Sequence, residues 1–216
     1  IFFFLVACNT AIATPVTGSD ILLQAEALPV SEREPYLLSH LLSAEAKGQL
    51  TFSKIKWSAP AKDGLASHTV TLQISTDYLA VGESKPVRVP LTPNSAQLIA
   101  DAYNCLLPTP KIVDQIHLSA RHKLEPQPFS PDNYQIESVT LWNLHHDAIE
   151  AQLKKVGARP GELVSGIKKD VVITARLAEK LKPARVAIYG WHKADGKPIQ
   201  PLSLVHRADY LDYSHG

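Results

Sequence analysis

The stretch between residues 192 and 215 carries the densest group of side chains that could do chemistry. Imidazole and carboxylate together suit proton transfer, because histidine changes its charge near neutral pH and a carboxylate can fix its tautomer. This pattern predicts a catalytic site in which His206 is the general base and Asp212 orients it. Tyr210 would donate a hydrogen bond to the transition state, and His215 would act as a second base. The other polar side chains of this stretch include His192, Asp209, Tyr213 and Ser214.

The same stretch could instead bind a metal ion or a partner. His192 and His206 would supply two zinc ligands, and either Asp212 or His215 would supply a third. Such a set leaves the fourth position for water, as catalytic zinc sites require. The spacing matches no zinc motif, and the sequence contains no His-Glu-x-x-His. Zinc is therefore one expected cofactor, beside a metal-free catalytic site and a polar surface that binds a partner.

The last residues, Ser214-His215-Gly216, resemble the opening of the Ser-His-Gly-Cys motif of L,D-transpeptidases. In that family the cysteine of the motif is the nucleophile, and the substrate is the bacterial cell wall. The sequence stops before the position of that cysteine. The resemblance covers three residues and implies chemistry on peptidoglycan.

Cys105 is an alternative nucleophile. It precedes a strand candidate at residues 185–190, a hairpin at Gly196 and later histidines, an order similar to that of NlpC-like cysteine peptidases. Those enzymes cleave peptidoglycan stems with a thiolate that imidazole activates. Asn104-Cys105-Leu106 stands where that family has Asp-Cys-Ser or Asp-Cys-Gly. The competing interpretation is an inert cysteine buried between two helices, which is the commoner case for a lone cysteine.

The first residues predict export. Residues 1–7 read IFFFLVA, an apolar run too short to span a bilayer, which takes about 20 residues. Leu5-Val6-Ala7-Cys8 resembles the bacterial lipobox, and this resemblance implies a lipid anchor at Cys8. Ala11-Ile12-Ala13 offers a competing cleavage site for plain secretion. We expect residues 1–20 to be a signal and linker segment whose beginning is missing, because no initiator Met or basic region precedes the run.

Length and composition predict a single domain over residues 21–216, either complete at residue 216 or continued beyond it. The 216 residues include 22 Lys and Arg against 21 Asp and Glu, a net charge of +1, and 45% are hydrophobic. A chain with this charge balance has no strong positive potential that would attract the phosphates of a nucleic acid, so no nucleic-acid partner is expected. The apolar content excludes an intrinsically disordered chain.

Periodicity and cap residues predict helices through the first two thirds of the chain. A helix over residues 31–48 would begin with a capping box at Ser31. Thr92 and Thr109 each precede a proline, which predicts a capped helix start at both positions. A further helix is expected over residues 136–156, before a terminal glycine.

Alternating and short apolar runs predict strands. The candidates are residues 67–75, 87–91, 170–173, 185–189 and 198–200. His68 lies on the apolar face of the first strand and is expected to be a hydrogen-bonded core histidine. His145 and His146 cannot share a helix face, so both are expected to be partly exposed. The fold class is predicted to be α+β, with a helical middle segment packed on a mostly antiparallel sheet.

Residues 166–173 and 187–201 resemble segments of a group of exported bacterial proteins to which no activity is attached. Together these features predict a protein of the bacterial cell envelope. Its function is expected to be hydrolysis of peptidoglycan or another envelope polymer through the C-terminal site. The alternative is a non-catalytic envelope module that binds a protein or glycan partner through its histidines and the aromatic side chains Tyr189, Trp191, Tyr210 and Tyr213.

Overall fold

The structure, a computed structural model, describes residues 14–64, 66–130, 132–179 and 184–216. Its fold is α+β, as the sequence predicts. The helices of the described residues are α1 (Gly18–Ala27), α2 (Val30–Leu41), α3 (Ala44–Gln49), α4 (Pro93–Ala102), α5 (Pro110–Ser119) and α6 (Val139–Val156), with a short 3₁₀ helix at Ala175–Ala178. The strands are β1 (Phe52–Pro60), β2 (Ser67–Ser75), β3 (Ala80–Val81), β4 (Val87–Arg88), β5 (His122–Lys123), β6 (Val164–Ser165), β7 (Lys169–Val171), β8 (Ile188–His192) and β9 (Pro198–Ser203).

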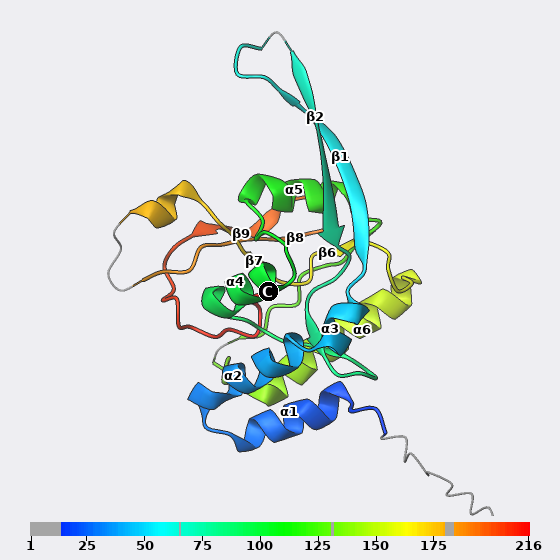
Figure 1. The fold of residues 1–216 in the computed structure, drawn as a ribbon, viewed down its shortest axis with the longest axis vertical. Helices are drawn as coiled ribbons and strands as arrows, with labels where there is room; N and C mark the ends of the chain where they lie inside the picture. Colours follow the sequence, from blue (N-terminus) through cyan, green and yellow to red (C-terminus); the bar gives the residue numbers. More distant parts are fainter. Residues whose placement is uncertain (1–13, 65, 131, 180–183) are drawn as a thin grey trace, which may run out of the picture.

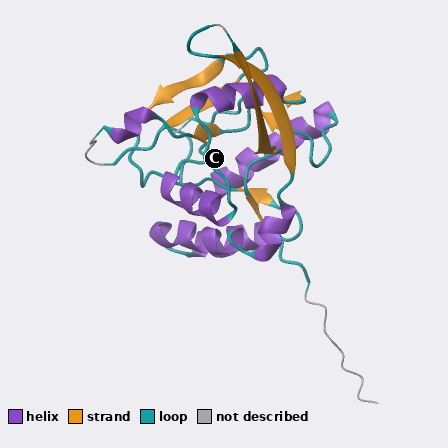
Figure 2. Cartoon of the chain, turned by 45° about the horizontal axis from the view of Figure 1, so that its top comes forward, coloured by secondary structure: helices purple, strands orange, loops and turns teal. Residues whose placement is uncertain are grey.

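The strands form several small sheets instead of one large one. β7, β8 and β9 make a three-stranded antiparallel sheet, and α5 packs against β8. β5 and β6 pair in parallel, whereas β3 and β4 pair antiparallel. β1 and β2 form a long antiparallel hairpin at one end of the molecule, and α1 and α2 lie at the other end (Figures 1 and 2).

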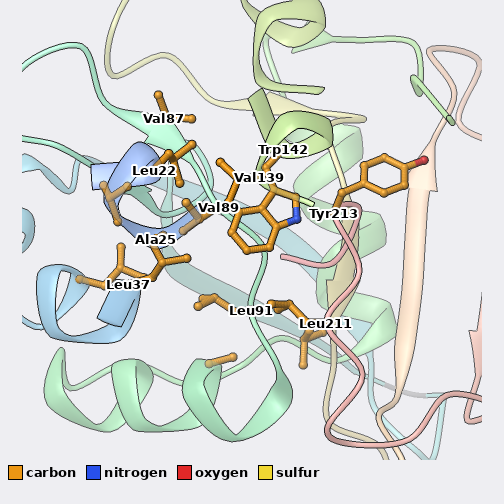
Figure 3. Packing of buried hydrophobic residues seen from close by; sticks show 14 of the residues in the cluster. Leu22, Ala25, Leu37, Val87, Val89, Leu91, Val139, Trp142, Leu211 and Tyr213 are labelled. Atoms are coloured by element: carbon orange, nitrogen blue, oxygen red, sulfur yellow. The ribbon is translucent and has the colours of Figure 1, made fainter. Parts of the chain in front are cut away.

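The main core surrounds Trp142 of α6, whose side chain is buried among residues from helices, loops and the C-terminal segment (Figure 3). Burial of a large indole provides one of the largest single hydrophobic contributions that a side chain can make. The core therefore fixes the C-terminal segment against α6. Labelled neighbours in this cluster include Leu22, Leu37, Val89, Leu91, Val139, Leu211 and Tyr213.

The helix boundaries that depend on local caps are confirmed. The hydroxyl oxygens of Thr92 and Thr109 accept hydrogen bonds from backbone N–H groups in the first turns of α4 and α5. Ser138, a cap that was not predicted, does the same for α6, which begins at Val139 and not at residue 136. Gly157 ends α6 with a φ of 66°, a left-handed conformation that glycine adopts without steric cost.

Two predictions about the first fifty residues are wrong in detail. The helix expected over residues 31–48 is divided into α2 and α3, because the Ser43 hydroxyl accepts a hydrogen bond from the Ala46 N–H and caps a new helix. Ser31 lies inside α2, and Glu34 accepts a hydrogen bond from the Thr92 N–H. The segment assigned to signal and linker also overlaps the fold, since Thr17 caps α1 with a capping box.

Two histidines differ from their predicted environments. His68 is exposed, because it lies on the half of the β1–β2 hairpin that extends beyond the body of the protein. His145 is only 2% exposed, since it faces the core from α6, while His146 lies at the surface side and is half-buried. Strand β1 was not predicted, although Ile55 and Trp57 alternate with two lysines there.

Candidate functional site

The C-terminal segment is held in the fold as an additional strand beside β7. The Lys169 N–H donates to the Ser214 carbonyl at 2.7 Å, and the Gly216 N–H donates to the Lys169 carbonyl at 3.0 Å. The Val171 N–H donates to the Gly216 carbonyl at 2.8 Å. This parallel pairing buries the side chains from Leu211 to His215, so the predicted site lies against the sheet and not on a free tail.

A cavity of about 350 Å³ opens beside this segment. One part of its wall is aromatic, and the other part carries polar groups that the sequence placed in a catalytic role. Such a combination of apolar wall and few polar groups is typical of ligand sites. The lining residues include Phe129, Trp191 and Tyr213 on the aromatic side, and Lys169, Gln200, His206, Tyr210 and Asp212 on the polar side.

The structure brings together the four residues predicted to be catalytic. The rings of His206 and Tyr210 are stacked, with centroids 4.9 Å apart and an angle of 2° between their planes. The ring of His215 lies edge-on to both, with its centroid 5.8 Å from that of His206 and 6.3 Å from that of Tyr210. Asp212 Oδ2 lies 4.0 Å from His215 Nε2. That distance is too long for a hydrogen bond.

Both histidines of this cluster are held in the neutral form. Burial lowers the pKa of His206, and the nearby Lys169 ammonium lowers it further. Burial also lowers the pKa of His215, although Asp212 acts in the opposite direction. Neither ring nitrogen of the fully buried His215 has a hydrogen-bond partner among the residues that the structure describes. A neutral imidazole can accept a proton, so His206 meets the first requirement of a general base.

Asp212 is held ionised by its neighbours. Burial acts to raise its pKa, but the Lys169 ammonium and the hydrogen bonds from Ser214 keep the pKa below its usual value. Its Oδ1 accepts from the Ser214 hydroxyl at 2.6 Å and from the Ser214 N–H at 2.8 Å. Its Oδ2 lies 3.6 Å from Lys169 Nζ. Asp212 therefore carries a fixed negative charge on the floor of the site.

Lys169 and Trp191 are site residues that the sequence reasoning did not include in the catalytic set. The Lys169 ammonium lies 5.6 Å from the centre of the Trp191 ring, within the range of a cation–π contact. Trp191 has a φ of 51°, an uncommon conformation for a bulky residue, beside a register irregularity in β8. In the sequence Lys169 is adjacent to Lys168, and nothing in this pair marks one of the two lysines as a site residue.

His192 does not join the C-terminal site, which corrects the predicted set of His192, His206 and Asp212. Successive side chains of a strand point to opposite faces. Trp191 of β8 lines the cavity, whereas His192 faces α5 and lies 3.0 Å from Asp114 Oδ1 through its Nε2. In the described part of the chain, no group of three or more His, Cys, Asp or Glu side chains is placed to hold a metal ion. The geometry therefore does not assemble the expected zinc ligands.

His192 belongs to a second polar cluster between α5 and β8. Its ring stacks on that of His117 at a centroid distance of 4.7 Å, and His117 Nδ1 lies 3.0 Å from the Ser165 hydroxyl. The Tyr189 hydroxyl donates to Asp114 Oδ1 at 2.8 Å. Asp114 and His117 share a helix face because they are three residues apart. Since these rings are buried and no cavity reaches them among those described, we interpret this cluster as a structural link.

Replacing Asp114 with Ala should destabilise the fold without changing the cavity. The substitution leaves Tyr189 and His192 without their shared acceptor, and such a loss costs on the order of 1–3 kcal/mol. Urea unfolding would measure the free energy. Asp101→Ala is the matched control, because Asp101 accepts from the exposed Gln97 side chain. Equal stability of the two variants would contradict a structural role for Asp114.

Cys105 is not arranged as an activated nucleophile. It is half-buried in the turn after α4, and its thiol donates to the Tyr103 carbonyl at 3.4 Å. Among the described residues, no histidine lies within hydrogen-bond distance of it. This geometry fits neither the NlpC-like arrangement nor a fully buried core cysteine.

The predicted lipidation site, Cys8, lies outside the described residues. Within the described ranges, none of the helices has both the length and the hydropathy that a membrane span requires.

Comparisons with protein-family models, curated proteins and solved structures found no match.

Proposed function

We propose that this protein is a hydrolase of the bacterial cell envelope with His206 as its general base. The observation that carries the proposal is the neutral, partly exposed imidazole of His206 on the wall of a cavity with an aromatic side. A base must be unprotonated at the working pH and must reach the solvent or the substrate. His206 meets both conditions, whereas His215 is neutral but fully buried.

The chemistry would be water attack on an amide carbonyl. His206 would take a proton from a water molecule while the water oxygen bonds to the carbonyl carbon, and the imidazolium would then return the proton to the leaving amine. Burial raises the pKa of Tyr210, and Asp212 adds to this effect, so the hydroxyl stays protonated and can donate to the oxyanion. The negative charge of Asp212 would stabilise the imidazolium cation across the site.

Peptidoglycan is the proposed substrate class, with other envelope polymers as the wider group. The aromatic wall of Phe129, Trp191 and Tyr213 offers flat amphipathic surfaces, which suit sugar rings and short peptides. The export signal predicted from residues 1–8 supports the same location, with the membrane reached through a lipid anchor at Cys8. The proposed setting is therefore the lipid-anchored, periplasmic or secreted fraction of the envelope.

His206→Gln should slow the release of soluble fragments from purified peptidoglycan, while binding to the insoluble polymer is kept. Loss of a general base lowers the rate by about 10²- to 10⁴-fold. The wild-type rate should rise as pH increases through the lowered pKa of His206 and should be level above about pH 6.5, where the base is neutral. His40→Gln, on α2, is the control and should keep full activity. Equal fragment release by wild type and His206→Gln would refute the assigned base.

A non-catalytic glycan-binding module is the second candidate. The observation that favours it is that, among the described residues, no carboxylate is hydrogen-bonded to the His206 ring, so no group fixes its tautomer. Wild-type protein that sediments with insoluble peptidoglycan but releases no fragments would support this module and contradict the hydrolase. Phe129→Ala should then weaken the sedimentation, because it removes part of the aromatic wall.

A further inference from the structure

The hairpin of β1 and β2 forms an arm that extends from the body of the protein (Figure 1). The two strands pair antiparallel over their whole length, from Phe52 opposite Ser75 to Pro60 opposite Ser67. A two-stranded ribbon is only marginally stable in water unless further strands or a helix support it. Near the body, Ile55 is buried in a cluster that includes Ile116 of α5. In the distal half, one face of the arm is exposed and the other is only partly buried, at Ala59 and Val70.

The two free edges of the arm differ in their chemistry. β1 carries Lys54, Lys56 and Pro60, which are the residue types that natural edge strands use to prevent pairing with another chain. β2 reads SHTVTLQIS and contains no Lys, Arg, Asp, Glu, Pro or Gly. Among the described residues, its backbone pairs with β1 alone. One edge is therefore protected and the other is open to strand addition.

We propose that β2 pairs antiparallel with β2 of a second copy of this chain. An uncharged strand rich in β-branched residues can pair with itself without bringing like charges together. Centred on Thr71, the pairing places Thr69 opposite Gln73 and Val70 opposite Leu72. This register keeps the partly buried face of Val70 and Leu72 continuous across the junction, whereas a shift by one residue would place apolar side chains opposite polar ones.

The chemistry of the edges also limits the assembly to a dimer. A twofold pairing of β2 creates a four-stranded sheet in which the two outer strands are the β1 strands. Their lysines and proline then occupy both remaining edges, so no further chain can add. The added strands would supply the support that the distal half of each arm lacks in one copy.

The test compares the association of the full chain and of charge variants by sedimentation equilibrium. Thr69→Lys with Gln73→Lys places like charges opposite each other at the junction, so the dimer should dissociate at least tenfold more readily than the wild type. Thr69→Lys with Gln73→Glu places opposite charges there and should restore wild-type association. Ser58→Lys, on the outer face of β1, is the control and should change nothing.

A crosslink at the proposed twofold axis keeps the test decisive if the charge variants disturb the arm. Opposite residues of an antiparallel pair have Cα atoms about 4.5 to 5.5 Å apart, within disulfide range. Thr71→Cys should therefore give a disulfide between two copies on mild oxidation, identified as a linked peptide by mass spectrometry, and Ser58→Cys should not. Three results would overturn the proposal: a monomeric wild type, a dimer that both charge variants leave unchanged, or the absence of the Thr71→Cys crosslink. It would also be overturned if β2 paired only with other peptides and not with a second copy of this chain.

Discussion

Gly166→Ala is expected to destabilise the protein by about 3 kcal/mol or more, because no room exists for one methyl group. A Cβ at this position would lie 2.1 Å from the Leu124 carbonyl oxygen and 3.0 Å from the His192 carbonyl oxygen. Both are backbone atoms, which cannot rotate away as a side chain would. Gly166 also has a φ of 86°, a conformation that L-residues rarely adopt. Thermal unfolding should show a midpoint lower by roughly 10 °C for a domain of this size.

Gly157→Ala separates the two causes. Gly157 has a similar φ of 66°, but beyond its own chain neighbours and helix no atom of the described residues lies within 4 Å of the position of its Cβ. This variant should cost about 1 kcal/mol from the backbone conformation alone. The difference between the two variants measures the steric effect at Gly166. Equal losses of stability in the two variants would mean that the carbonyl oxygens of Leu124 and His192 do not lie this close to Gly166.

The parts of this fold that sequence predicts well are those fixed by a few neighbouring residues. Thr92 and Thr109 start helices because each offers a side-chain oxygen to the N–H groups of the next turn. Gly157 ends one because it accepts a left-handed φ. The same reasoning applied to Ser43 would have divided the helix expected over residues 31–48. A serine within a helical pattern can cap a new helix, as Ser43 does for α3.

In the candidate site, neighbouring residues could be predicted to lie together, but the direction of His192 could not. His206, Tyr210, Asp212 and His215 are close in sequence, so the fold could bring them together with a short loop and one added strand. His192 is separated from them by β9, and its direction depends on which face of β8 packs on α5. That choice is made by tertiary contacts with residues such as Asp114, far away in the sequence.

The burial of the Lys168 ammonium could not be predicted from the sequence either. Lys168 and Lys169 look like one basic dipeptide, yet the Lys168 side chain is 1% exposed and its ammonium donates to the Tyr213 carbonyl. Burial lowers the pKa of Lys168 to about 7. Lys168 directly precedes β7, which begins at Lys169, and of the two side chains only that of Lys169 lines the cavity. A pairing partner for β7 had to be known before this difference could be predicted.

The buried histidines should make the folded state sensitive to acid. Burial lowers the pKa of His117 to about 4 and that of His145 to about 2, and it also lowers the pKa of His215. In the unfolded chain these groups titrate near the ordinary value of about 6.5, so the unfolded chain binds more protons below that pH. The free energy of unfolding is therefore expected to fall as pH drops from about 6.5 towards 4, by about 1 to 3 kcal/mol per buried histidine.

One buried carboxyl group acts in the opposite direction. Burial raises the pKa of Asp170 to about 7, so the folded chain holds a proton there that the unfolded chain releases above about pH 4. On acidification from pH 7, Asp170 alone would therefore add stability. Three histidines oppose this one group, and Lys168 is protonated in both states well below pH 7, so the net effect of acid remains a loss.

His145→Leu isolates one of these contributions. The substitution removes an imidazole whose buried Nε2 has no hydrogen-bond partner in the described part of the chain. Leucine is an apolar side chain of similar size that favours the helix. The variant should be at least as stable as the wild type at pH 7 and should lose less stability on acidification, because it takes up one proton fewer on unfolding. His40→Gln, on α2, is the matched control, because it removes a histidine that is not fully buried. Urea unfolding at a series of pH values would measure all three proteins. An unchanged slope in His145→Leu would show that His145 is not held neutral by burial, and the acid sensitivity would then have to come from other groups.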